Sequence, residues 1–264
     1  MTPARALGFC NRRHSFRETI LTKALDVLIR KLREHSRLGR DDLAELHTLS
    51  HTTREFQPNE DLIRQGDNAR VSALVLKGMV ARYHLLPDGG RQYISFHMAG
   101  DMPDSQALFI DRMDHALCAI GPALIASLPH QELIALFNRR PPLAFAIWRE
   151  TLIDAAIFRE AITNNSARTM PARMAHLFCE LFYRARVSGL ATGNTCRVPI
   201  GLNQLGETLG MSIATVNRTL QELRASRAAD LRSGELVIEN WLSLAELGQF
   251  DPGYLHLKKP PQIL

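Results

Sequence analysis

Apolar residues recur at helical spacing near the beginning of the chain. Leu21, Leu25, Leu28 and Leu32 follow one another every three or four residues, which predicts an amphipathic helix. Its opposite face carries lysine and arginine side chains. We interpret it as a surface helix docked on a core, with contact to a nucleic acid or a membrane as the alternative.

From about Phe56 the pattern changes to short apolar runs separated by Gly, Pro, Asp and Asn. Apolar runs separated by turn-forming residues predict strands and turns, and Pro87–Gly90 is a strong hairpin signal. Several short strands at near-regular spacing predict a small barrel or sandwich. Helical spacing returns over residues 131–140.

A long helix is predicted over residues 143–163. One stripe of it is apolar but interrupted by an acid, and its members are Leu143, Ile147, Thr151, Asp154, Phe158 and Ala161. Such a mixed stripe can pack partly on its own domain and partly on a partner helix. We therefore predict a dimer interface that includes Leu143, Ile147 and Phe158. The polar residues 164–166 predict a hinge after the helix.

Residues 202–225 carry the spacing of two short helices joined by a tight turn. Apolar residues give each helix one buried face: Leu202, Leu205, Leu209, Val216, Leu220 and Leu223. Gly206 leaves room for a crossing helix, and Gly210 ends the first helix without a conformational penalty. Ser212 is a suitable N-cap for the second helix. This arrangement predicts a helix-turn-helix.

The second of these helices points a polar and basic face outward. Its members are Ala214, Asn217, Arg218, Gln221 and Arg224. Asn and Gln side chains pair with adenine edges, and Arg pairs with guanine or phosphate. Two short strands around Ser233 and Gly234 predict a wing beside the helices. We therefore predict DNA binding through a recognition helix over residues 212–225, with contacts from Ser212, Ala214, Thr215, Asn217, Arg218 and Gln221.

The composition is that of an ordinary soluble globular protein, with 45% apolar and 22% charged residues, and 264 residues leave room for two domains. No apolar run approaches the roughly 18 residues of a membrane span, and we expect no export signal at the start of the chain. The cysteines are scattered without a CxxC pair, at Cys10, Cys118, Cys179 and Cys196. Their scatter predicts reduced thiols in a cytoplasmic protein.

The net charge of +5 is unevenly distributed along the chain. Residues 1–40 hold ten Lys and Arg against three Asp and Glu. Residues 41–167 hold eleven against sixteen, and residues 168–264 hold eleven against eight. Basic ends around an acidic middle suit a polyanionic partner.

These segments resemble the Crp–Fnr family of bacterial transcription regulators from about residue 28 to 240. The resemblance rests on LIRQGD, LVLKGMVARY, the MAGD turn, the long helix and LGETLGMSIATVNRTLQEL. In the general character of its sequence, the chain most resembles a branch of the family that is common in rhizobia and related bacteria. The resemblance implies a homodimer on a palindromic DNA site, with the 212–225 helix in the major groove and RNA polymerase as a partner.

The same resemblance implies an α+β fold. Its parts are a cyclic-nucleotide-binding-like β-roll (a double-stranded β-helix), a long dimerisation helix and a winged helix-turn-helix. The domains are expected as a basic N-terminal helical extension (1–40), the β-roll sensor (41–140), the dimerisation helix and hinge (141–166), the DNA-binding domain (167–242) and a C-terminal tail (243–264).

The recognition helix departs from the archetypal family pattern Ser-Arg-Glu-Thr-Val-x-Arg. Here the segment from Ser212 to Arg218 reads SIATVNR. It keeps the final arginine and lacks the Arg-Glu pair. The archetypal consensus site is therefore not carried over to this chain.

The effector motifs of the family are also absent. Members that bind cyclic nucleotides resemble one another in a Gly-Glu pair followed later by Arg and Ser or Thr. The matching pairs here are Asp104-Ser105 and Asp114-His115. A carboxylate stands where a guanidinium would meet the phosphate, so we predict that neither cyclic AMP nor cyclic GMP binds, unless a shifted register brings in Arg112.

No cofactor is predicted either. Iron–sulfur members use a cluster of N-terminal cysteines, and this N-terminus has only Cys10. The effector is left open: a different ligand, a redox signal at Cys179 or Cys196, and control by abundance are the alternatives.

Two other functions compete with the regulator. His84, His97 and His115 lie in the predicted roll, where oxygenases of the same architecture hold iron with two histidines and a carboxylate. The tight His-x-His or His-x-Asp pair of those enzymes is missing, so we interpret the histidines as surface or hydrogen-bonded residues and predict no metal and no enzyme. The other alternative is an interaction module that does not bind DNA.

Overall fold

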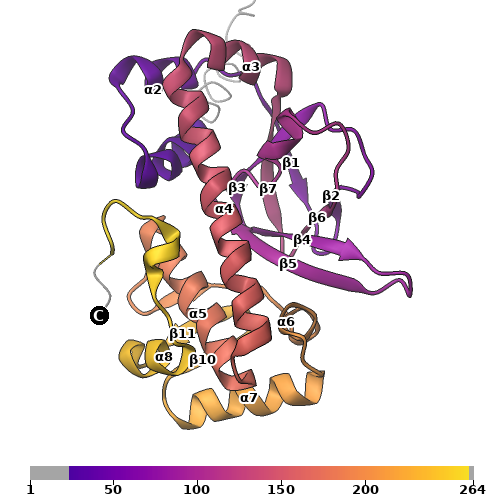
Figure 1. The fold of residues 1–264 in the computed structure, drawn as a ribbon, viewed down its shortest axis with the longest axis vertical. Coiled ribbons are helices and arrows are strands. Elements are labelled where there is room, and N and C mark those ends of the chain that lie inside the picture. The colour runs from indigo at the N-terminus through magenta and orange to yellow at the C-terminus, as the bar shows by residue number, and fades with distance from the viewer. Residues whose placement is uncertain (1–23, 262–264) are drawn as a thin grey trace, which may run out of the picture.

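The computed structural model describes residues 24–261. A β-roll and a helical C-terminal half are joined by one long helix, α4 (Figure 1). After an N-terminal helix described over residues 24–35, the helices are α2 (Arg40–Leu46), α3 (His130–Arg139), α4 (Pro141–Ala167), α5 (Met170–Val187), α6 (Leu202–Leu209), α7 (Ile213–Ala225) and α8 (Trp241–Gly248), with short 3-10 turns η1 (Ser105–Leu108) and η2 (Pro252–Leu255). The strands are β1 (Thr52–Phe56), β2 (Asp61–Ile63), β3 (Val71–Lys77), β4 (Met79–Leu85), β5 (Arg91–Met98), β6 (Ala116–Ala119), β7 (Ala123–Pro129), β8 (Ala191–Thr192), β9 (Thr195–Arg197), β10 (Ala229–Arg232) and β11 (Glu235–Ile238).

The N-terminal helix docks its apolar face on the molecule, as its periodicity predicts. Leu25, Leu28 and Leu32 are buried and share one core with α3 and α4. Leu21 lies outside the described residues. The docked-helix interpretation is therefore confirmed for residues 24–35.

The roll consists of antiparallel sheets that face each other across an apolar interior. One sheet has the order β1-β7-β3 and the other the order β2-β6-β4-β5. The predicted hairpin is confirmed: β4 and β5 pair over their length, and the turn at Pro87–Gly90 is closed by the Gly89 N–H donating to the Leu86 carbonyl at 2.9 Å. Gly78 joins β3 to β4 at φ +87°, and a Cβ there would lie 2.4 Å from the Pro122 carbonyl oxygen. Only glycine fits this turn.

Helix α4 continues through the segment for which a hinge is predicted, and that prediction is wrong. Asn164 is buried, and its amide donates to the Arg173 carbonyl at 3.1 Å, which anchors the last turn of the helix. The helical conformation ends instead at Arg168, whose backbone is extended, and Thr169 is the N-cap of α5. Asn164 and Asn165 therefore bond across to α5 and α6, and Ser166 bonds back to the Ile162 carbonyl within α4, so these polar residues do not end the helix.

The predicted dimer stripe of α4 also needs correction. Leu143 and Ile147 are 0% and 4% exposed because they pack within one subunit against the N-terminal helix and α3. Buried in this way, they cannot form a seam with another chain. The large apolar side chains that α4 leaves exposed lie on a neighbouring face: Phe145, Trp148, Leu152 and Ile162. Phe158, the third predicted residue, is half-buried between these faces.

The C-terminal half is a winged helix-turn-helix built on α5. Its strands form a sheet in the order β10-β11-β9-β8, and the predicted wing is the β10–β11 hairpin around Ser233 and Gly234. Helix α8 packs against α5, with Leu244 fully buried. The expected start of the tail at residue 243 is therefore wrong, because α8 continues to Gly248 and belongs to this domain.

Helices α6 and α7 cross closely at Gly206, as the sequence predicts. A Cβ on Gly206 would lie 2.6 Å from the Met211 carbonyl oxygen in the turn. Gly210, at φ +65°, ends α6 in the left-handed conformation. The turn geometry thus depends on glycine at both positions.

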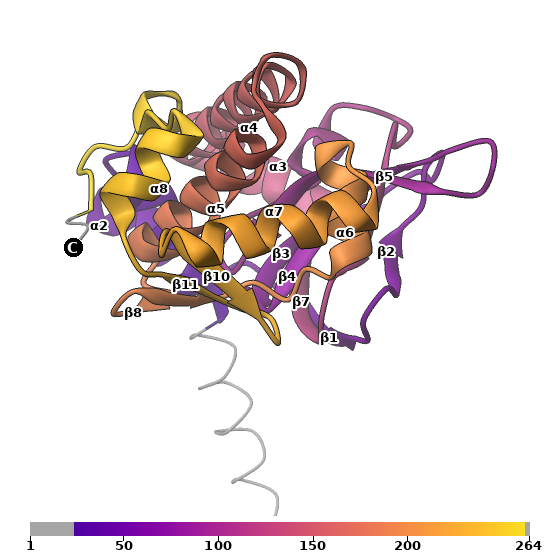
Figure 2. The same ribbon diagram turned by 90° about the horizontal axis from the view of Figure 1, so that it is seen from below.

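The C-terminal half packs directly on the roll, and one apolar core runs through both. Met79, Ala81 and Tyr93 of the β4–β5 sheet share this core with Leu205 and Leu209 of α6. In the view from below, α6 and α7 lie under the roll (Figure 2). The two halves therefore form one continuous body.

We expect Gly206→Ala to destabilise the helix-turn-helix. The added methyl group must displace the Met211 carbonyl, a distortion that costs roughly 1–3 kcal/mol. Thermal unfolding should show a lowered Tm. The matched control is Gly201→Ala at the N-cap of α6, where φ is −82° and a Cβ would lie 3.5 Å from its nearest neighbour. Equal Tm values for the two variants would contradict this account of the crossing.

Candidate nucleic-acid interface and sensor interior

Helix α7 presents its outer face to solvent at the lower surface of the molecule (Figure 1). Its inner face is held by buried Val216, Leu220 and Leu223. The side chain of Ser212 caps the helix by accepting from the Thr215 N–H at 3.2 Å. The helix is therefore fixed from its first turn by packing and by its cap.

The residues predicted to contact DNA are brought together at this face. Ser212, Ala214, Asn217, Arg218 and Gln221 are exposed, and Thr215 is half-buried beside the cap. The Asn217 amide donates to the carbonyl of Ile213 one turn back at 3.1 Å. Arg218 lies 3.9 Å from Glu222 in an exposed pair that water screens. Ser212 and Thr215 thus have structural roles, while Asn217, Arg218 and Gln221 offer exposed polar surface.

Arg224 differs from the other outward residues of α7. Its guanidinium donates to one oxygen of Asp230 at 3.0 and 2.7 Å, and Arg232 lies 2.6 Å from the other oxygen. These bonds tie the end of the recognition helix to strand β10 of the wing. Helical spacing alone could not reveal this, because Asp230 comes from a different element.

Inside the roll, Arg82 of β4 is the buried cation that the sequence analysis missed. Its Nε donates to the Pro103 carbonyl at 2.7 Å, and its guanidinium pairs with Asp154 of α4. The guanidinium also lies over the Phe158 ring, 5.2 Å from the centroid. The available signal was Arg82 standing two residues after buried Val80 in a strand, where the alternation places both on the same face.

Some of the residues that stand at the positions of the family's phosphate cassette face the interior of the roll. Asp104 is buried and accepts from the Ala73 N–H at 2.8 and 3.0 Å, and burial raises the pKa of its carboxyl to about 7. His115 is buried, whereas Asp114 and Arg112 are exposed. The register that would bring Arg112 into the roll is therefore not adopted.

The histidines of the roll do not converge. His84 is exposed, His97 bonds to Ser95 at 2.8 Å, and His115 lies between Asp114 and Gln106 at 2.7 and 3.3 Å. Burial and the nearby Arg82 charge lower the pKa of both His97 and His115. Among residues 24–261 no group of three or more His, Cys, Asp and Glu side chains is arranged to hold a metal ion.

The cysteines within the described range are not activated thiols. Cys118, Cys179 and Cys196 are all buried. Burial raises the pKa of Cys118 to about 11 and that of Cys196 to about 12, and it also raises the pKa of Cys179. Since the thiolate is the reactive form, this environment does not favour a redox signal at Cys179 or Cys196. Cys10 lies outside the described residues.

No helix within residues 24–261 is long and apolar enough to cross a bilayer.

The chain is similar to known proteins over both halves. A family model described as a cyclic nucleotide-binding domain matches residues 53–140, and a Crp-like helix-turn-helix domain matches residues 172–247. The fumarate and nitrate reduction regulatory protein of Vibrio cholerae is 23% identical over 210 residues, which cover 80% of this chain and 84% of the relative. The protein of the same description from Escherichia coli K12 is 21% identical over the same coverage.

Solved structures show the same fold. FixK2 from Bradyrhizobium japonicum superposes with a TM-score of 0.67 at 23% identity, covering 75% of this chain and 98% of that protein. A Crp/Fnr-family transcriptional regulator from Thermus thermophilus gives a TM-score of 0.58 at 18% identity, covering 75% and 99%. The helix-turn-helix with its exposed recognition face, the β-roll and these relatives agree: the chain belongs to the Crp–Fnr family of DNA-binding transcription regulators.

Proposed function

We propose that this regulator binds a palindromic DNA site as a homodimer, with α7 of each subunit in the major groove. The observation that carries the proposal is the exposed face of α7, on which Asn217, Arg218 and Gln221 reach solvent from a helix fixed by its cap and core. Two such helices related by a two-fold axis would read half-sites about one turn apart, roughly 34 Å. RNA polymerase is the partner we propose for the DNA-bound dimer.

We assign the recognition of DNA base edges to side chains in the middle of α7. Arg218 suits a guanine edge, and Asn217 or Gln221 suits adenine. Ile213 and Ala214 have no hydrogen-bonding side chains, so they contribute at most contacts to thymine methyl groups. Arg224, tied to Asp230, is assigned to holding the wing in place, and exposed Arg232 to a backbone phosphate.

The dimer is assigned to the exposed apolar face of α4. Phe145, Trp148, Leu152 and Ile162 are between 53% and 69% exposed in the single chain. They follow one another at intervals that place them along one side of the helix. Large apolar groups exposed in a row are costly in water, and a second α4 packed against them would remove them from it.

The sensor is proposed not to bind cyclic AMP or cyclic GMP. A buried cyclic phosphate needs a cation and hydrogen-bond donors, and the buried Arg82 guanidinium is already engaged by Asp154 and the Pro103 carbonyl. Asp104 adds a buried carboxyl whose two oxygens already accept from the Ala73 N–H.

We expect Arg218→Ala to weaken specific DNA binding far more than binding to random DNA. Loss of one bidentate base contact costs about 1–3 kcal/mol of discrimination, or roughly 10- to 100-fold in affinity. The measurement is a fluorescence anisotropy titration on a palindrome selected by the wild-type protein from random duplexes, compared with a scrambled duplex.

Arg232→Ala is the contrasting variant for this test. A phosphate contact carries no sequence information, so affinity for both duplexes should fall about equally. Equal losses on both duplexes for Arg218→Ala as well would contradict the base-reading role of Arg218.

We expect Leu152→Asp to abolish the dimer. A charge placed in the apolar seam should give particles of 29.6 kDa in sedimentation instead of twice that mass. Affinity for the palindrome should fall about 100-fold because the second helix no longer binds in the same complex. Leu242→Asp, at a residue 78% exposed on α8, is the matched control and should stay dimeric. A dimeric Leu152→Asp would rule out this face as the interface.

We expect isothermal titration of the wild-type dimer with cyclic AMP or cyclic GMP to give no binding heat up to about 1 mM nucleotide, because the buried Arg82 guanidinium is already engaged by Asp154 and the Pro103 carbonyl. The same preparation must bind the selected palindrome, which confirms that it is folded. Saturable binding at micromolar nucleotide would overturn the proposal for the sensor.

A further inference from the structure

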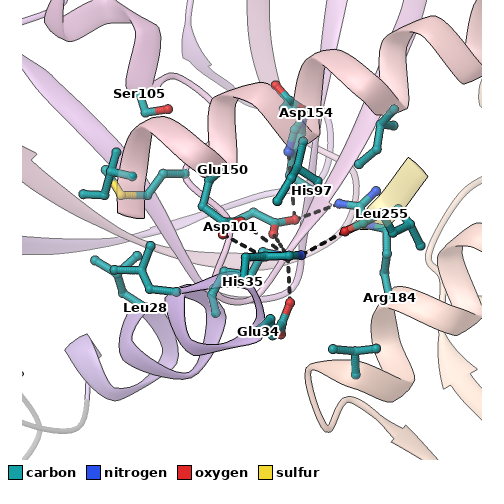
Figure 3. A pocket seen from close by; sticks show the side chains of 18 of the residues that line it. Leu28, Glu34, His35, His97, Asp101, Ser105, Glu150, Asp154, Arg184 and Leu255 are labelled. Atoms are coloured by element: carbon teal, nitrogen blue, oxygen red, sulfur yellow. Dashed lines mark hydrogen bonds and ion pairs between the residues drawn. The ribbon is translucent and has the colours of Figure 1, made fainter. Parts of the chain in front are cut away.

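A buried cluster of charges lies where the N-terminal helix, the roll, α4 and α5 meet (Figure 3). Lys31 of the N-terminal helix is surrounded by carboxylates from three of these elements. Its Nζ lies 3.0 Å from Glu34, 3.4 Å from Asp101 and 3.8 Å from Glu150. Gly100, next to Asp101, has φ +101°, and a Cβ there would lie 3.1 Å from the Lys31 Cβ, so the helix approaches this turn as closely as glycine permits.

Asp101 links this cluster to the DNA-binding half. Its carboxylate accepts from Arg184 of α5 at 2.9 Å and from the Met98 N–H at 2.9 Å. Burial alone would raise the pKa of Asp101, but the charges of Lys31 and Arg184 hold it well below its usual value. The roll, the N-terminal helix and α5 are therefore joined through one ionised carboxylate.

His35 closes the cluster on the side of the C-terminal tail. Its ring Nδ1 lies 2.8 Å from Oε1 of Glu150, and its Nε2 lies 3.0 Å from the Leu255 carbonyl oxygen. A carboxylate and a carbonyl both accept hydrogen bonds. A neutral imidazole has a single N–H, so both bonds form only when the ring carries two protons.

The tail that His35 holds packs on the molecule through its apolar residues. We define the tail as residues 249–258. Leu255 is buried with Ile153 and Tyr183, and the Lys258 N–H donates to the Glu34 carbonyl at 3.2 Å. Packing and hydrogen bonds thus join the tail to both α4 and the N-terminal helix.

The N-terminal helix and the tail together form what we call the terminal clasp, made of residues 24–35 and 249–258. Both segments lie outside the regions that match the family models, residues 53–140 and 172–247. The clasp connects the two halves of the molecule independently of the junction between α4 and α5 at residues 168–169. The tail follows the DNA-binding domain directly and bonds back to the segment before the roll.

We propose that His35 is a proton-dependent positioning residue: doubly protonated, it pins the tail and holds the DNA-binding half in this orientation on the sensor. When the ring loses its second proton, one of the two bonds is lost and the clasp loosens. The charged and titratable groups that line the same pocket or bond to this segment are Lys31 and Glu34 on its own helix, Arg149, Glu150 and Asp154 on α4, His97 and Asp101 on the roll, Arg184 on α5 and Lys258 on the tail.

The sign of the pH effect follows from the two acceptors. The clasp is complete when the ring carries both protons, and it loses its bond to Leu255 when the ring is left with a single N–H. The consequence for DNA rests on the proposed palindromic dimer. A fixed orientation of two recognition helices lowers the ordering cost of binding both half-sites, so loosening should reduce affinity for the palindrome.

The test is hydrogen exchange of the tail amides in the free full-length dimer, between pH 5.5 and 8.5 and corrected for the intrinsic pH dependence of exchange. In the wild type we expect protection of residues 252–258 to fall about tenfold across this range, the size of one charge-assisted hydrogen bond. His35→Gln keeps a donor but cannot titrate, so its protection should not change with pH. His256→Gln, at an exposed histidine beside Leu255, is the control and should follow the wild type.

Comparison between variants isolates His35, because Asp104 and the other titrating groups are common to all of them. The same pH dependence in His35→Gln as in the wild type would overturn the proposal. If that variant does not fold, Glu150→Gln replaces it. Removing the anion beside the ring should move the midpoint of tail release to lower pH, and an unchanged midpoint would count equally against the proposal.

Titrations with the selected palindrome at the two pH limits test the positioning role. We expect the wild type to lose affinity severalfold more than His35→Gln between pH 5.5 and 8.5. Equal losses would contradict positioning by the clasp. Failure of every variant to bind any palindrome at either pH would instead contradict the proposed function, and the exchange experiment would still test the clasp.

Discussion

The carboxylate of Asp101 is the point on which the arrangement of the whole molecule depends. It meets Lys31 from the N-terminal helix at 3.4 Å and Arg184 from the DNA-binding half at 2.9 Å, in a site from which water is largely excluded. Removing one partner of such a buried group leaves an uncompensated charge, which costs far more than an exposed pair is worth. Asp101 therefore ties α5, and with it the helix-turn-helix, to the roll.

The same logic explains why the roll can keep the family fold without the family's phosphate cassette. Arg82 and Asp154 satisfy each other inside the roll, so the cation that a cyclic phosphate would need is engaged between β4 and α4. Because Asp154 belongs to the long helix that carries the exposed apolar face, this pair connects the interior of the roll to the proposed dimer seam.

Sequence patterns correctly predicted the elements that are determined by residues close together in the sequence. The glycine at 206, the N-cap at Ser212 and the leucine spacing are sufficient for the helix-turn-helix, and the Pro87–Gly90 turn is sufficient for its hairpin. Sequence patterns failed where contacts between residues far apart in the sequence determine the structure. Helical spacing cannot tell which apolar stripe of α4 the N-terminal helix covers, so Leu143 and Ile147 were assigned to the wrong interface. The bonds of Arg224 to Asp230 and of His35 to Leu255 join segments that no periodicity relates.

The central claim is that two copies of α7 read a symmetric DNA site. It is tested most directly by genome-wide capture of the DNA bound to the native protein, followed by alignment of the captured sequences. The account predicts one dominant motif with two-fold symmetry and half-sites centred about 10 base pairs apart. Captured fragments that share no symmetric motif would contradict it.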